Sequence, residues 1–69
     1  MNDRATIAVA QYVSEKGIKI SAMSRATKIS EGILRRSLST KERDLRAEEF
    51  LKICRFLGKS AFDFYDQAG

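Results

Sequence analysis

Basic side chains gather in one stretch of the sequence, between positions 35 and 46. Five residues of this stretch are basic and two are acidic, which gives it a net charge of +3. The basic residues are Arg35, Arg36, Lys41, Arg43 and Arg46. Guanidinium and ammonium groups bind polyanions, and arginine can donate two parallel hydrogen bonds to phosphate or to guanine. The chemistry that this stretch offers is therefore anion binding.

Residues that could perform catalysis or hold a metal are scarce. The chain contains no His, and its one Cys, Cys54, lies in an apolar helical pattern where a small core residue is expected. Glu48 and Glu49 are adjacent, so they would point to different sides of a helix. Neither a glycine-rich phosphate loop nor a calcium-loop spacing is present. The sequence predicts no enzyme activity, no metal, no cofactor and no small-molecule substrate.

The composition indicates a small basic domain. The 69 residues are 43% hydrophobic and carry a formal net charge of +4. This length and this hydrophobic content fit one folded domain, 1–69. The charge favours a polyanion such as nucleic acid or an acidic membrane, although a slightly basic solvated surface would have the same total. No apolar run approaches the roughly 20 residues that cross a bilayer, and no secretory pattern is present. We therefore expect a cytoplasmic protein outside the membrane.

Helical signals recur along the chain, and strand signals are weak. Apolar spacing and capping residues predict helices over about 3–16, 21–28, 31–38, 47–57 and a short segment after Ser60. Gly17 and Gly58 follow two of these patterns as helix-ending residues, and Ser30 can cap the third. The polar residues 39–44 are typical of a loop. The sequence thus predicts an all-α fold of five helices.

The second and third predicted helices have the spacing of a helix-turn-helix. Such a motif needs a small residue where the helices cross, a turn residue, a buried apolar residue and an apolar residue that holds the helices together. These positions are filled by Ser24, Lys28, Ile29 and Leu34. The two helices are therefore expected to pack closely across a short turn.

Two longer segments resemble the phage-repressor and Cro-like (XRE-type) helix-turn-helix domains. Residues 17–30, GIKISAMSRATKIS, align without gaps to the family pattern Gly-Leu-Thr-Gln-x-x-Leu-Ala-x-x-x-Gly-Val-Ser. Residues 47–60, AEEFLKICRFLGKS, are similar to the later pattern x-x-Glu-x-Leu-x-x-Ile-Ala-x-Ala-Leu-Gly-x-Ser. The resemblance covers most of the chain. It implies a compact, lambda-repressor-like bundle of five helices.

The chain departs from the family pattern at several places, of which the replacement of the common Ala by Ser24 keeps a small residue. Ile20 stands where Gln is common, so a frequent phosphate contact is missing or moved. Lys28 stands where the turn Gly is common and must accept the same backbone conformation. Many members pair an Arg with a Glu at the positions of Val13 and Leu38. We interpret this last difference as an ion pair replaced by an apolar contact, which is physically reasonable because buried ion pairs are often no better than packed hydrophobes.

The resemblance implies a sequence-specific regulator of transcription that binds double-stranded DNA, expected to be a repressor of phage or bacterial origin. Its third helix, 31–38, would enter the major groove. The residues that would face the bases are Ser30, Glu31, Gly32, Arg35 and Arg36. Contacts to phosphate would come from Ser39, Thr40, Lys41, Arg43 and Arg46. In the alternative interpretation, the arginines are ordinary solvated residues and Glu31 only favours the helix dipole.

The C-terminal aromatic residues suggest a second surface. Phe62, Phe64 and Tyr65 are three aromatics within four residues, which leaves two interpretations open: they cover the core, or they form a homodimer interface. Repressors of this class commonly bind two-fold sites as dimers. A different function on the same fold is a protein-interaction module, such as an antitoxin, adaptor or inhibitor, and the apolar Ile20 favours it.

Overall fold

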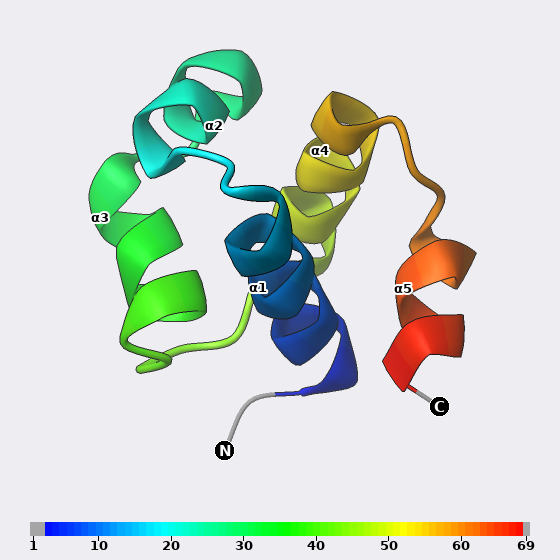
Figure 1. Cartoon of the computed structure of the whole chain (residues 1–69). Coiled ribbons are helices and arrows are strands. Elements are labelled where there is room, and N and C mark those ends of the chain that lie inside the picture. Colours follow the sequence, from blue (N-terminus) through cyan, green and yellow to red (C-terminus); the bar gives the residue numbers. More distant parts are fainter. Residues whose placement is uncertain (1–2, 69) are drawn as a thin grey trace.

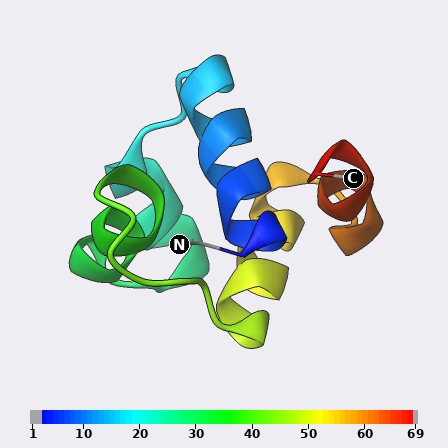
Figure 2. The same cartoon turned by 90° about the horizontal axis from the view of Figure 1, so that it is seen from below.

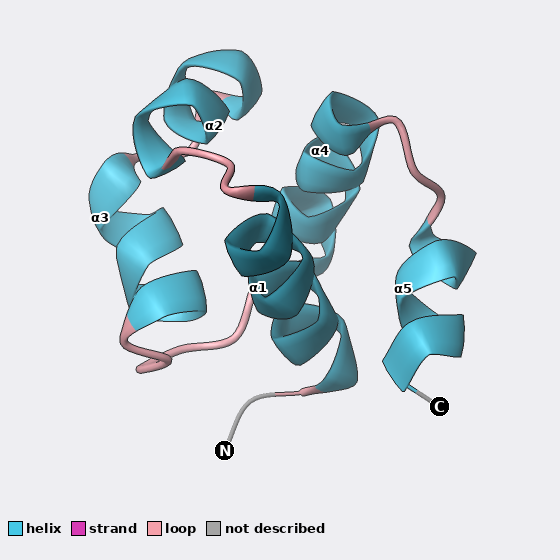
Figure 3. Cartoon of the chain, viewed as in Figure 1, coloured by secondary structure: helices cyan, strands magenta, loops and turns pink. Residues whose placement is uncertain are grey.

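The computed structural model describes residues 3–68, and for residues 65–68 only the backbone is described. Within this range the chain forms five helices joined by short loops. No strand occurs among these residues, so the all-α prediction is confirmed (Figure 1, Figure 3). The third helix continues without interruption into a π-helical turn, η1. The elements are α1 (Arg4–Lys16), α2 (Ile20–Thr27), α3 (Glu31–Leu34), η1 (Arg35–Ser39), α4 (Ala47–Leu57) and α5 (Ala61–Ala68).

The helix ends follow from the capping residues in the sequence. The Asp3 carboxylate accepts a hydrogen bond from the Thr6 amide at 2.8 Å at the start of α1. The Ser30 hydroxyl does the same for the Ile33 amide at 3.2 Å at the start of α3. Gly17 and Gly58 end α1 and α4 with φ angles of 65° and 71°, a left-handed conformation that glycine adopts without steric cost. The predicted ranges agree with the observed helices to within one residue where both ends were predicted, and α2 both begins and ends one residue earlier than expected.

The core lies where the helices meet around α1. In two perpendicular views, α1 is central, with α2 and α3 on one side and α4 and α5 on the other (Figure 1, Figure 2). Its main partners are α5 and η1, while α2 packs on α4. Val13 and Leu38 are both buried in this core. The family's ion-pair positions therefore hold apolar core residues in this chain.

The end of the third helix is wider than a regular α-helix. The amide of Thr40 donates to the carbonyl of Arg35 at 2.9 Å, a bond that spans five residues. The carbonyl of Arg36 accepts from the amides of Glu42 and Arg43. The following loop thus satisfies the last carbonyls of the helix, which would otherwise lack partners. A π turn of this kind leaves no periodic signal in the sequence and was absent from the sequence prediction.

Phe64 of α5 is completely buried, with 0% of its surface exposed. Its ring packs edge-on against Tyr12 and Phe50, at centroid distances of 5.7 and 5.9 Å. Phe64 therefore belongs to the core of its own chain. This corrects its placement in a dimer interface, because a buried ring offers no surface to a second copy. The side chain of Tyr65 lies outside the described part of the chain.

Candidate nucleic-acid interface

The turn between α2 and α3 is built by local hydrogen bonds. Lys28 ends α2 with a φ of 66°, and its amide donates to the carbonyl of Ser24 at 2.9 Å. The Thr27 hydroxyl donates to the carbonyl of Met23 and accepts from the Ile29 amide. Ile29 itself is buried. Lys28 thus adopts the conformation predicted for the turn, although a residue with a Cβ atom is strained there.

Residues of α3 and η1 form one face that is open to solvent. Ser30, Gly32, Arg35 and Arg36 are exposed, and Glu31 is half-buried. On the opposite side of the same helix, Leu34 and Ser37 are fully buried. All five residues predicted to face the bases are therefore at least partly accessible, with Ser30 as the N-cap directly before α3 and the other four within α3 and η1.

The two arginines of this face have different surroundings. The Arg35 guanidinium forms an ion pair with Glu31 at 3.0 Å, one helical turn earlier. The Arg36 Nε donates to the carbonyl of Gly32 at 3.3 Å, so its side chain lies back along the helix. A Cβ atom added to Gly32 would be 3.5 Å from the Arg36 Nη2 atom. An alanine at position 32 would therefore make only an ordinary contact with the Arg36 guanidinium.

Four of the five predicted phosphate contacts are open to solvent, between the last residue of η1, Ser39, and the N-cap of α4, Arg46. Ser39, Thr40, Lys41 and Arg46 are exposed. Arg43 differs: its guanidinium donates to the Ser37 hydroxyl at 2.8 Å and to Glu49 at 3.0 Å. The Glu49 carboxylate also accepts from the Arg46 amide at 2.8 Å. Arg43 thus joins η1 to the first turn of α4, a positioning role that no sequence motif signalled.

The N-terminal end of α1 holds the other end of this loop. The Leu45 amide donates to the buried Thr6 hydroxyl at 2.9 Å, and the Asp3 amide donates to Asp44 at 2.8 Å. The loop is consequently fixed at both ends before it meets any partner. The loop begins directly after η1, the turn that carries Arg35 and Arg36, at one edge of the molecule (Figure 1).

Residues 9–65 match the model of the Cro/C1-type helix-turn-helix DNA-binding domain family. The chain belongs to this family. No curated protein and no solved structure gives a significant match. The Cro/C1-type assignment covers α2, α3 and the loop described above, and it confirms the predicted family and its DNA-binding, transcription-regulating class. Members of such DNA-binding families are typically not enzymes.

Three other features of this Cro/C1-type domain bear on the predictions. The thiol of Cys54 is buried, as expected. Its pKa is raised mainly by burial and to a smaller extent by the negative charge of Asp63. None of the described helices has the length and apolar character needed to span a membrane. Phe62 is 76% exposed, the largest value among the exposed large hydrophobic side chains of the described chain. Phe62 is thus the one residue of the C-terminal aromatic set that the structure describes at the surface.

Proposed function

We propose that this Cro/C1-type domain is a sequence-specific repressor of transcription that acts in the cytoplasm and binds double-stranded DNA with α3 in the major groove. The observation that carries the proposal is the exposed face of α3 and η1, in the second helix of a helix-turn-helix and next to a cationic loop. A helix so placed can present side chains to base edges in the groove. Repression follows if the bound domain occupies a site that polymerase needs.

The proposed base contacts are Ser30, Glu31, Arg35 and Arg36, with Gly32 allowing close approach. Arg36 is the better candidate for reading guanine. Its charge has no acidic partner among the ion pairs of the described residues, whereas Arg35 is paired with Glu31. Moving Arg35 onto a base would first break that ion pair, although an exposed pair of this kind contributes only about 0.3–0.5 kcal/mol.

The proposed phosphate contacts are Ser39, Thr40, Lys41 and Arg46. Contacts of this kind set the register of a protein on DNA without reading sequence. Arg43 acts in this proposal by fixing the loop, because its guanidinium is already engaged by Ser37 and Glu49.

The proposal includes a homodimer. Phe62 is mostly exposed on α5, and an aromatic ring left in water favours an interface. A two-fold dimer would place its reading helices about 34 Å apart on one side of the duplex. Sedimentation velocity of the chain and of Phe62→Ala tests this arrangement: the variant should sediment as a monomer where the parent chain dimerises. A parent chain that remains monomeric on its own and on DNA would contradict the dimer.

Selection of bound duplexes from a random pool, followed by fluorescence anisotropy at two salt concentrations, tests the proposed function. A consensus sequence should emerge, and Arg36→Ala should relax its specificity by about 1–3 kcal/mol at one position. Lys41→Ala should weaken binding to all sequences about equally and reduce the salt dependence. The absence of any binding at low salt would refute the proposal. Equal losses from both variants on all sequences would show that the helix does not read bases.

A protein-interaction module is the second candidate. Ile20 is half-buried at the start of α2, and Leu51 of α4 is 57% exposed, so apolar side chains are available outside the proposed DNA-binding face. A protein partner in stoichiometric amount, in a preparation free of DNA, would support this function. The same preparation tested on the selected duplex separates the two candidates.

A further inference from the structure

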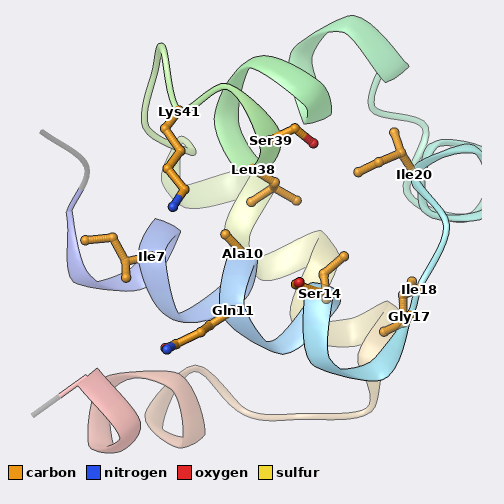
Figure 4. A pocket seen from close by; sticks show the side chains of 11 residues that line it. Ile7, Ala10, Gln11, Ser14, Gly17, Ile18, Ile20, Leu38, Ser39 and Lys41 are labelled. Atoms are coloured by element: carbon orange, nitrogen blue, oxygen red, sulfur yellow. The ribbon is translucent and has the colours of Figure 1, made fainter.

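A groove with a volume of about 710 Å³ opens beside α1, where the start of α2 and the end of η1 approach it (Figure 4). Its apolar wall is formed by Ile7, Ala10, Ile18, Ile20 and Leu38. Ile7 is 43% exposed, and Ile18 and Ile20 are half-buried, so this wall is left partly in water. Covering this apolar surface would be favourable because it removes the surface from water. The volume is within the range of small-molecule sites.

The polar lining of the groove consists of Gln11, Ser14, Ser39 and Lys41, and Lys41 is its charged member. Its side chain extends from the loop toward Ile7 and Ala10, and the amine lies at the edge of the apolar wall (Figure 4). No acidic residue lines the groove, and none of the ion pairs among the described residues involves Lys41. Lys41 also has a φ of 60°, a left-handed conformation that is strained for a residue with a Cβ atom. Strain of this kind is concentrated at ligand sites.

We propose that this groove binds a small apolar carboxylate. The hydrocarbon part would cover the isoleucines and Leu38, and the carboxylate would accept hydrogen bonds from the Lys41 amine. A neutral hydrocarbon would bring the amine close to apolar surface without a counter-charge, which is unfavourable. Inorganic phosphate would satisfy the amine and leave the apolar wall in water. Only a molecule with both parts matches the whole groove.

Such a ligand would regulate DNA binding, a consequence that depends on the proposed function. Lys41 is one of the proposed phosphate contacts, and its amine can neutralise either the ligand or the DNA. Binding of the two should therefore be antagonistic, and the antagonism must be reciprocal at equilibrium. The predicted regulator thus has a site for a small-molecule signal within the DNA-binding domain itself.

Titration of the ¹⁵N-labelled chain with octanoate, without DNA, tests the site. Octanoate below its micelle concentration should shift the amides of Ala10, Ile18, Ile20, Leu38 and Lys41 in a saturable manner. Octanol has a similar chain without charge, and acetate has the charge without the chain, so both should bind at least about tenfold more weakly. Equal binding of octanol and octanoate, or shifts scattered over the whole surface, would overturn the proposal.

Lys41→Met removes the charge and keeps the length of the side chain, so it should weaken octanoate binding about tenfold. Lys52→Met is the matched control, because Lys52 is exposed on α4 and does not line the groove; it should change binding less than about twofold. An unchanged affinity in Lys41→Met would overturn the proposal. A spectrum that otherwise matches the parent chain shows that each variant is folded.

A second titration on the selected duplex tests the regulatory consequence. Octanoate should weaken DNA binding of the parent chain and have much less effect on Lys41→Met. Octanoate binding without any effect on DNA affinity would remove the regulation and leave the site intact. Failure of the chain to bind DNA at all would refute the proposed function. The titration without DNA would still show whether the groove binds octanoate.

Discussion

The side chains of Arg43 and Glu49 form an ion pair of 3.0 Å that ties the loop after η1 to the first turn of α4. Both side chains are largely shielded, with exposed fractions of 27% and 11%. Arg43 also reaches the buried hydroxyl of Ser37, which in turn donates to the carbonyl of Ile33 at 2.9 Å. The reading helix and α4 are therefore connected by a continuous set of hydrogen bonds through one guanidinium. The sequence lacks the family's ion pair at the positions of Val13 and Leu38. The Arg43–Glu49 pair provides an ion pair at a different place, between the loop after η1 and α4.

Removal of either partner of this pair should destabilise the domain. Arg43→Met and Glu49→Gln should each lower the free energy of unfolding by about 1–3 kcal/mol, because the remaining partner stays largely shielded from water and loses the charge-assisted hydrogen bond between the two side chains. The double variant should lose less than the sum of the two, a coupling that urea unfolding of all four chains can measure. The exposed pair Glu31–Arg35 is the matched control and should couple by only about 0.3–0.5 kcal/mol. Additive losses at Arg43 and Glu49 would contradict this account.

Lys28→Gly should stabilise the domain by about 0.5–1 kcal/mol. Lys28 adopts a φ of 66° with a Cβ atom, and glycine removes that steric cost. Thermal unfolding should show a midpoint that is a few degrees higher. Lys52→Gly, in the exposed interior of α4, should have the opposite sign and lose about 1 kcal/mol. Destabilisation by both glycines would mean that the turn is not strained.

Gly32→Ala should raise stability while lowering affinity for DNA. The new methyl group would meet Arg36 Nη2 at 3.5 Å, an ordinary contact, and alanine is favoured over glycine in a helix by up to about 1 kcal/mol. In the proposed complex, however, the methyl would lie between the helix and the bases. Urea unfolding and anisotropy on the selected duplex give the two quantities separately. An unchanged affinity would mean that the helix does not approach DNA through Gly32.

The buried thiol of Cys54 should make stability depend on alkaline pH. Burial, and then the charge of Asp63, raise its pKa above the ordinary value of 9.0, so the folded state keeps a proton that the unfolded state releases. Its contribution is fully present below about pH 9 and is lost as the pH rises toward the higher value in the folded state. Urea unfolding at about pH 8 and about pH 10 should show a larger loss for the parent chain than for Cys54→Ala. Identical pH dependence of the two chains would exclude this contribution.

The helix boundaries could be predicted from the sequence because capping is local. Asp3, Ser30 and Ser60 each bond an amide three residues later, within the same short segment that suggested the cap. The position of the reading face was predictable for the same reason, because residues three or four positions apart lie on the same side of a helix. These features needed no knowledge of the rest of the chain.

Features that depend on distant partners were beyond the sequence. Phe64 is buried because Tyr12 and Phe50 flank it, and neither contact is visible in the C-terminal segment. The π turn exists because loop amides return to the carbonyls of Arg35 and Arg36. The groove beside Lys41 is formed by three separate elements. Each of these required the packed arrangement of helices before it could be recognised.

Two hydrogen bonds join parts of the chain that are far apart in the sequence. The Leu45 amide and the Thr6 hydroxyl are separated by 39 positions, and the Asp3 amide and the Asp44 carboxylate by 41 positions. The Leu45 amide can keep its partner only while the N-terminal helix is docked, because Thr6 is buried in that contact. The order of the loop is consequently part of the same cooperative unit as the core and not a local property of the turn. Hydrogen exchange at Leu45 should therefore report global unfolding of the domain.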